Sequence, residues 1–514
     1  METMGILSLL PPILAIILAF TTKQVMVSLF AAIWVGATMV YGWNPVTGLM
    51  GAFSDFIFPA IGNTDNSPVL VMTVFCGSFS YLLENGGGAK VFAETLASKV
   101  KGRKGAQILT AVGGTVIFFS DSTNPVLIGP VFKPLTDKML VSREKLAYIV
   151  DSTSATMPSM FFFTAWGAYI LTIVAQQLSY LGDSTNAVIA FNQAVPFMFY
   201  TIGAVLMVYF IGITGFDYGP MAAAEKRAAE EGKVVADEHV TDRLIRKVVI
   251  PEGATPHLSS MVVPLVTLVV CIFAGLLYTG GFPERNVIDA LANCSTMKSL
   301  VTAFFVATVV AAIYTIKDKV YTVTESITAI MAGITQMMEA CVILTLAWSI
   351  GSVCKAVGTT AYVISITESW LTPAMMFIVL FVVSAFTAFC TGTSWGTFSI
   401  YLPIAMPLAA AIGAPIAPAI GLVISGGIFR DHCSPISDTT VLSSIGSSCD
   451  HIAHVGTQLV YALTVAACAA VAYLFVGLTF ESLGLYVAAA IGIVITVLGS
   501  WAVATIAHKA TVKK

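Results

Sequence analysis

The chain has 514 residues, of which 57% are hydrophobic and only 10% are charged. Soluble domains carry about 25% charged residues, so this composition excludes an ordinary soluble globular protein and predicts an all-α polytopic membrane protein surrounded by membrane lipid. The net charge of −3 is too small to indicate a nucleic-acid partner.

Apolar runs long enough to cross a bilayer recur along the whole chain. A transmembrane helix needs about 20 apolar residues to cross a hydrocarbon core about 30 Å thick. By this criterion we predict eleven spans, with residue ranges 6–22, 25–41, 68–84, 145–178, 195–214, 259–279, 300–316, 335–354, 416–448, 453–475 and 484–507. The first of them lacks a basic n-region, so we expect a retained span and not a removable signal peptide.

Two further apolar stretches, 106–138 and 374–412, are each interrupted near the middle by a polar patch that contains glycine or proline. Irregular backbone is tolerated at membrane depth only where protein or a water-filled cavity surrounds it. We therefore predict two re-entrant hairpins instead of two further spans.

The lysines and arginines gather in connections that this span count places on one side of the membrane. These connections are 85–105, 136–145, 216–258 and the carboxyl-terminal tail. Cytoplasmic loops carry the excess of basic residues, so we predict that the amino terminus faces out and the carboxyl terminus faces in. The stretch 216–258 is expected to be a solvated cytoplasmic linker with a short helix at AAAEKRAAEE.

The two predicted hairpins share a motif. The first contains SDSTNPVLIGPVFKP (120–134) and the second contains TSWGTFSIYLPIAMP (393–407). Each motif places a hydroxyl-rich patch before a Pro-x-x-x-Pro sequence, so that Pro130 matches Pro403. Similar stretches flank both copies in the same order, and we therefore predict an internal repeat.

Each copy of the repeat contains five predicted spans, an odd number, so the second copy must be inverted relative to the first. We predict a first inverted repeat at 1–215, a linker at 216–258, a second inverted repeat at 259–475, and an extra carboxyl-terminal span with the tail at 476–514. Each repeat has five spans plus a re-entrant hairpin and a broken helix. In secondary transporters of this architecture, binding sites lie near the midplane where interrupted segments meet.

The stretch RDHCSPISDTT (430–440) places several charges between two apolar runs. A charge at mid-membrane costs about 2.5 to 3.5 kcal/mol, so we expect these side chains to face a protein interior or a watery cavity. Pro435 breaks the helix between Asp431 and Asp438. Carboxylates, freed carbonyls and nearby hydroxyl groups are hard oxygen ligands, and we predict a Na⁺ site formed by Asp431, Asp438, Ser434, Ser437 and Thr439. The alternative is that Asp438 only caps the helix that follows.

The matching segments of the first repeat carry two acids and several hydroxyl or amide side chains: Asp121, Ser122, Thr123, Asn124, Asp151, Ser152 and Thr153. The second hairpin offers Thr393 and Ser394 but no acid, so the two halves are chemically unequal. These residues either line the site or only satisfy backbone groups between packed helices.

A buried carboxylate loses the solvation that favours its charged form, so a proton competes with a metal ion for it. Such competition is the simplest route to Na⁺/H⁺ exchange. The sequence contains no ATP-binding motif and no nucleophile elbow, so we expect no enzyme activity and no cofactor. Na⁺ is then the transported or coupling ion.

The segment GGIFRDHCSPISDTTVLSS (426–444) resembles the signature of the NhaC family of Na⁺/H⁺ antiporters, within the larger ion-transporter superfamily. The resemblance implies a secondary transporter of the bacterial inner membrane with inverted repeats, and a homodimer. It points to Asp431, Ser434, Ser437, Asp438 and Thr439 as site residues.

One residue departs from the family pattern. Arg430 stands where the resemblance implies a small residue before the first acid. Its guanidinium would either neutralise Asp431 or bind a substrate carboxylate through two hydrogen bonds.

Two transport functions therefore remain open. The first is Na⁺/H⁺ antiport by carboxylates that hold Na⁺ and H⁺ in turn. The alternative is a Na⁺- or H⁺-coupled carrier of a small amino acid or organic acid, held by Arg430, the patch 122–124 and the positive ends of half-helices. The paired broken motifs disfavour a receptor or a channel.

Overall fold

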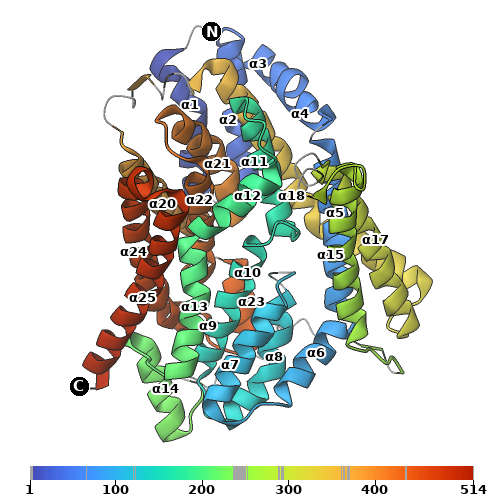
Figure 1. The fold of residues 1–514 in the computed structure, drawn as a ribbon, viewed down its shortest axis with the longest axis vertical. Helices are drawn as coiled ribbons and strands as arrows, with labels where there is room; N and C mark the ends of the chain where they lie inside the picture. Colours follow the sequence, from blue (N-terminus) through green and yellow to red (C-terminus); the bar gives the residue numbers. More distant parts are fainter. Residues whose placement is uncertain are drawn as a thin grey trace.

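The computed structural model describes residues 4–512 apart from 23, 65, 120, 122, 236–249, 252, 288–289, 291–293, 360–361, 363–364, 367–370 and 435–436. Every regular element in this part of the chain is a helix, which confirms the predicted all-α class. Figure 1 shows helices that cross the molecule between an end with the amino terminus and an end with the carboxyl terminus.

The first half of the described chain contains sixteen helical elements besides the short 3₁₀ helix Gly5–Leu9. They are α1 (Leu10–Thr22), α2 (Val25–Val40), α3 (Pro45–Gly51), the π-helix η2 (Ala52–Ile57), α4 (Phe58–Gly62), α5 (Ser67–Asn85), α6 (Gly88–Ala97), α7 (Gly102–Val116), α8 (Thr123–Lys138), α9 (Arg143–Ser154), α10 (Thr156–Ser159), α11 (Ala165–Leu181), α12 (Ala187–Ala194), η3 (Val195–Phe197), α13 (Phe199–Thr214) and α14 (Gly219–Glu231).

The second half contains fewer and longer helices. They are α15 (Ser259–Thr279), α17 (Thr296–Lys317), α18 (Val323–Val357), α20 (Pro373–Thr391), α21 (Ser394–Ala411), α22 (Ile416–Phe429), η5 (Arg430–His432), α23 (Asp438–Ser447), α24 (His451–Leu483) and α25 (Leu485–Val512).

Among the described residues, seven helices are long and apolar enough to cross a membrane, or up to eight if α2 and the segment 45–62 count as one bent span. Six of them overlap predicted spans, and the seventh, α20, is one arm of the second predicted hairpin. The count of eleven spans stays a prediction. Both of the longest predicted spans, 145–178 and 416–448, are broken in the structure, at 155–164 and at 430–437.

The connection 42–67 between the second and third predicted spans is mostly helical. Asn44 caps α3 by accepting hydrogen bonds from the backbone N–H groups of Val46 (3.0 Å) and Thr47 (3.3 Å). After α2 the chain bends by 114° and continues through α3, η2 and α4. Helix α3 begins with a proline, Pro45, at its first helical position. Proline there is a helix-start signal, but a search for long apolar runs does not use it.

Both predicted hairpins are pairs of helices, α7 with α8 and α20 with α21. The second hairpin turns at Gly392, whose φ of +70° is a left-handed conformation that glycine adopts without strain. The matched Pro-x-x-x-Pro sequences lie inside α8 and α21.

The packing of the two halves is reciprocal. Helix α8 of the first hairpin packs against α23, which follows the break in the second half, and α21 of the second hairpin packs against α11, which follows the break in the first half. Figure 1 shows α7 and α8 in the lower part of the molecule and α20 and α21 in the upper part. A repeat with inverted copies would produce this arrangement, although the inverted orientation itself stays a prediction.

Helix α14 confirms the predicted short helix in the linker, but it is docked on other helices instead of lying free in solvent. Arg227 in α14 pairs with Glu144 in α9 at 2.9 Å, and Arg103 in α7 pairs with Glu225 in α14 at 2.7 Å. The rest of the linker, 236–249, lies outside the described residues. We call the end of the molecule that carries α6, α7, α14 and the carboxyl terminus the basic end (Figure 1).

Candidate ion-binding site

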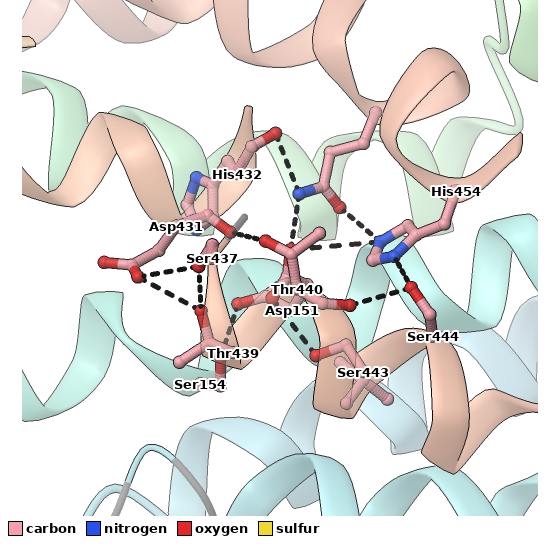
Figure 2. Close-up of polar contacts among 12 residues, drawn as sticks. Asp151, Ser154, Asp431, His432, Ser437, Thr439, Thr440, Ser443, Ser444 and His454 are labelled. Carbon is pink, nitrogen blue, oxygen red and sulfur yellow. Dashed lines mark hydrogen bonds and ion pairs between the residues drawn. The ribbon is translucent and has the colours of Figure 1, made fainter. Parts of the chain in front are cut away.

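Two fully buried carboxylates, Asp151 in α9 and Asp431 in η5, lie in one polar network where the broken helices of the two halves meet. Figure 2 shows the two acids with the hydroxyl-bearing side chains of α23 around them. Both backbones are interrupted here, α9 before α10 and α22 before α23, and the breaks bring polar groups into the interior.

Asp431 accepts hydrogen bonds from residues near it in the sequence and from the second hairpin. Its Oδ1 accepts from Arg430 Nε (3.0 Å), Ser437 Oγ (3.2 Å) and Thr439 Oγ1 (3.1 Å). Its Oδ2 accepts from Ser394 Oγ at 2.9 Å, at the start of α21. The structure therefore brings four of the predicted residues onto this one carboxylate, and its charge is balanced by a guanidinium.

Arg430 lies between the two predicted Na⁺ ligands. Besides its two bonds to Asp431, its Nη2 donates to Asp438 Oδ1 at 2.8 Å, and its Nη1 donates to the carbonyl oxygen of Gly392 at the tip of the second hairpin. The side chain of Arg430 is only 4% exposed. The guanidinium of Arg430 therefore lies between Asp431 and Asp438, where the sequence analysis predicted a Na⁺ ion.

Asp438 differs from the expectation of a sheltered acid. Its side chain is 73% exposed, whereas that of Asp431 is fully buried. Asp438 is the first residue of α23, and the capping position belongs to Ser437, so Asp438 is not itself the capping residue. A carboxylate in the first turn still interacts favourably with the helix dipole. The predicted Na⁺-binding role of Asp438 stays untested.

Asp151 has a different environment. Its Oδ1 accepts from Ser443 Oγ at 3.1 Å and its Oδ2 accepts from Gln458 Nε2 at 2.6 Å. Among the residues that the structure describes, the only basic side chain within ion-pair distance is His454, whose Nε2 lies 3.9 Å from Oδ2. No lysine or arginine of the described chain pairs with this acid.

The two acids are connected through the backbone of the break. Gln458 Nε2, which donates to Asp151, also donates to the carbonyl oxygen of His432 at 3.0 Å. Thr440 Oγ1 donates to the carbonyl oxygen of Asp431 at 2.6 Å. Displacing one carboxylate would therefore disturb the segment that holds the other.

The remaining residues predicted from the first repeat hold its hairpin against α9. The Nδ2 of Asn124 donates to the Gly114 carbonyl oxygen (2.8 Å) and to Thr153 Oγ1 (3.3 Å), while its buried Oδ1 has no partner in the described chain. Ser152 and Thr153 are buried in α9 beside Asp151. Asp121 is a partly buried turn residue and is not among the contacts of the two acids. Ser122 and the side chain of Thr123 lie outside the described residues.

Two predicted hydroxyl groups serve the backbone instead of the acids. Thr393 caps α21 by accepting from the Gly396 N–H at 3.2 Å. Ser434 donates to the carbonyl oxygen of Phe389 in α20 at 2.9 Å. For Thr393, a hairpin residue, the geometry agrees with the alternative of packing and backbone satisfaction.

Several residues of the network were not among the predicted site residues: Ser443, Ser444, His454 and Gln458. A signal for one of them exists, because Gln458 is an amide inside the apolar run VGTQLVYAL, and polar side chains within membrane spans are functional candidates by default. The carboxylate, hydroxyl and carbonyl oxygens gathered here are the ligand type that hard cations prefer.

The model of the Na+/H+ antiporter family matches residues 160–478. An uncharacterized protein of Haemophilus influenzae is 33% identical over 501 residues, 95% of this chain and 94% of that protein. The malate-2H(+)/Na(+)-lactate antiporter of Bacillus subtilis is 30% identical over 108 residues, which cover 21% of this chain and 23% of that protein.

Two solved transporters share the fold. The YdaH transporter of Alcanivorax borkumensis has a TM-score of 0.60 and 14% identity, and the match covers 88% of this chain and 97% of that one. MtrF of Neisseria gonorrhoeae has a TM-score of 0.51 and 13% identity over 93% of this chain and 94% of that one. Because the family model spans more than half of its length, this multi-pass secondary transporter belongs to the Na+/H+ antiporter family.

Proposed function

We propose that this protein exchanges Na⁺ for H⁺ across the bacterial inner membrane, and that Asp151 is the carboxylate that holds the two cargoes in turn. The observation that carries the proposal is that Asp151 is fully buried and its hydrogen-bond donors are neutral. Asp431 is equally buried but has the guanidinium of Arg430 against it.

The energetic argument is that a buried charge must be compensated. Removing an ionised carboxylate from water costs several kcal/mol, and two neutral donors do not cancel its charge. Asp151 therefore needs a proton or a cation in the site, and exchange of one for the other satisfies the site in both states. His454 lies too far away, at 3.9 Å, for a charge-assisted hydrogen bond.

Hydroxyl groups near Asp151 can act as hydrogen-bond donors to the carboxylate or as oxygen ligands of a Na⁺ ion. A serine hydroxyl has one proton and two lone pairs and rotates to suit its partner, so Ser443 can turn its oxygen toward a Na⁺ ion. The carbonyl oxygen of His432 and the hydroxyl of Thr440 lie in the same network and are oxygen ligands of the same kind.

We also propose that the basic end faces the cytoplasm. The carboxyl terminus and α14 lie at this end and the amino terminus lies at the other, as Figure 1 shows. Cytoplasmic loops carry the excess of lysine and arginine. A homodimer stays a prediction of the family resemblance.

The test is transport by the purified full-length chain in proteoliposomes that contain a pH-sensitive dye. An inward Na⁺ gradient should evoke proton efflux in the absence of any organic solute. Proton movement that requires an added organic or amino acid would overturn the proposal.

The second candidate is Na⁺- or H⁺-coupled transport of a small organic acid or amino acid. It is favoured by the similarity to the malate-2H(+)/Na(+)-lactate antiporter over 21% of the chain. Arg430 would be the anion ligand, but its donors are directed at Asp431, Asp438 and Gly392, so a substrate carboxylate would first have to displace Asp438. Malate-dependent or lactate-dependent flux in the same proteoliposomes distinguishes this candidate.

A further inference from the structure

A second buried polar cluster lies between Asp151 and the basic end. Lys145, two turns before Asp151 in α9, is fully buried and pairs with Asp217, which follows α13. The hydroxyl of Tyr461 in α24 donates to Asp217 Oδ1 at 2.6 Å. The proposed Na⁺/H⁺ exchange makes no use of this cluster, which lies on the side of Asp151 that faces the basic end.

Asp217 opens onto a cavity at the basic end. The cavity has a volume of about 580 Å³ and lies between α7, α14 and α25. Its lining includes Asp217, Gln107, Arg103, Lys226 and His508. A proton that reaches Asp217 is therefore in contact with the space outside the helices.

Tyr461 also lines a small void, whose lining includes two neighbours of Asp151, Ser152 and Gln458. The void offers about 10 Å³ to the centre of a water-sized sphere, which is close to the least that a single water needs. Its polar lining consists of Tyr148, Ser152, Tyr200, His432, Gln458 and Tyr461.

His432 supplies an independent sign of a water in this void. Its Nδ1 is hydrogen-bonded to the hydroxyl of Tyr200 at 2.8 Å, whereas its Nε2 is buried and has no partner in the described chain. A buried ring nitrogen without a partner is unfavourable, and buried waters typically satisfy such groups.

The void reaches the ion-binding acid through two of its lining residues. Gln458 donates to Asp151 Oδ2 at 2.6 Å, and Ser152 is the next residue along α9. Polar groups thus follow one another from Asp151 through the void, Tyr461 and Asp217 to the basic-end cavity.

We propose that this row of groups is the proton pathway between Asp151 and the basic-end cavity, with Tyr461 as its relay. This inference rests on the proposed Na⁺/H⁺ exchange. The proton that leaves Asp151 first protonates the water of the void. The hydroxyl oxygen of Tyr461 then takes a proton from this water, while the hydroxyl proton of Tyr461 passes to Asp217. Asp217 then releases a proton to water in the cavity, and the relay returns to its starting state when the Tyr461 hydroxyl rotates.

The test is Tyr461→Phe, which removes the relay oxygen and keeps the ring that packs against Tyr148 and Tyr218 at centroid distances of 4.8 Å. The matched control is Tyr218→Phe, because Tyr218 is in the same aromatic cluster but its hydroxyl donates to Thr464, away from the void. Proteoliposomes report two rates: Na⁺-evoked proton movement, and exchange of labelled Na⁺ for Na⁺, which needs no proton transfer.

We expect Tyr461→Phe to lower the rate of proton movement at least tenfold and to leave Na⁺/Na⁺ exchange within twofold of the wild type. Tyr218→Phe should leave both rates within twofold. Wild-type proton movement in Tyr461→Phe would overturn the pathway, and so would a parallel loss of both rates, which indicates a structural role. If the wild type itself shows Na⁺/Na⁺ exchange without proton movement, the proposed function fails before the pathway is tested.

Discussion

Asp151 lies near the end of α9, just before the break in the first half, and Asp431 lies in the break of the second half. Both acids are fully buried, yet their charges are compensated in different ways. Asp431 has a guanidinium and three hydroxyl donors, whereas Asp151 has one hydroxyl, one amide and a distant histidine. The difference teaches that burial alone does not mark an exchanging acid. Asp431 has its counter-charge within the chain, whereas Asp151 has none in the described chain and would have to obtain it from solution.

The largest effect should come from Asp151→Asn. An amide has the size of the carboxylate but neither its charge nor its proton, so Na⁺-evoked proton movement in proteoliposomes should fall at least a hundredfold. Asp183→Asn is a matched control, because Asp183 lies in the loop after α11, where it accepts hydrogen bonds from the backbone N–H and the hydroxyl of Thr185. Transport by Asp151→Asn at the wild-type rate would mean that another acid exchanges the ions.

The second effect concerns stability at Asp431. Arg430→Gln leaves a buried carboxylate without its counter-charge, and breaking a buried pair in this way costs about 3 to 5 kcal/mol. The double variant Arg430→Gln with Asp431→Asn should recover most of this loss, since no charge remains. The free energy of unfolding in detergent, measured for both single variants and the double variant, checks the coupling; additive losses would contradict the assignment of a structural pair.

A matched pair of serines separates the two acids by function. Ser443→Ala removes the hydroxyl that donates to Asp151. The concentration of Na⁺ needed for half-maximal transport should rise at least about tenfold, since a hydrogen bond to a charged group contributes about 1.5 to 3 kcal/mol. Ser394→Ala removes the hydroxyl on Asp431, which keeps its guanidinium, and the Na⁺ requirement should change less than twofold. Equal changes in both variants would remove the distinction between the acids.

The smallest effect should come from Asp438→Asn. The carboxylate is 73% exposed, and exposed ion pairs contribute about 0 to 1 kcal/mol, so the free energy of unfolding should change by less than about 1 kcal/mol. The same unfolding measurement checks this prediction. A loss comparable to that of Arg430→Gln would show that Asp438 is enclosed in the membrane-embedded protein.

The sequence predicted the parts of the fold that depend on local pattern. Long apolar runs, the interrupted hairpins and the charged stretch near 430–437 can be recognised in windows of about 20 residues. Six of the seven long apolar helices among the described residues overlap predicted spans. The helices of 45–62 were missed because their start signal is a short Asn-Pro sequence and not a long apolar run.

The composition of the site could be predicted only in part, because it depends on contacts between distant residues. Gln458 lies 307 positions from Asp151, and Ser443 lies 292 positions from it. Arg430 is adjacent in sequence to Asp431, but only its side-chain direction decides that it also reaches Asp438 and Gly392. Sequence spacing therefore identified the acids and left open which of them is neutralised.

The counter-charge of Asp431 is a side chain of the protein itself, Arg430, and this affects how the membrane potential would act on transport. Because the guanidinium is part of the chain, the charge on Asp431 is cancelled whether or not cargo is bound. Under the proposed exchange, only Asp151 would change its occupant. One carboxylate that held either a single Na⁺ or a single H⁺ would give a one-to-one stoichiometry, so a complete cycle of the proposed exchange would be electroneutral. The membrane potential would then neither drive nor oppose the exchange, and the two concentration gradients alone would set its direction.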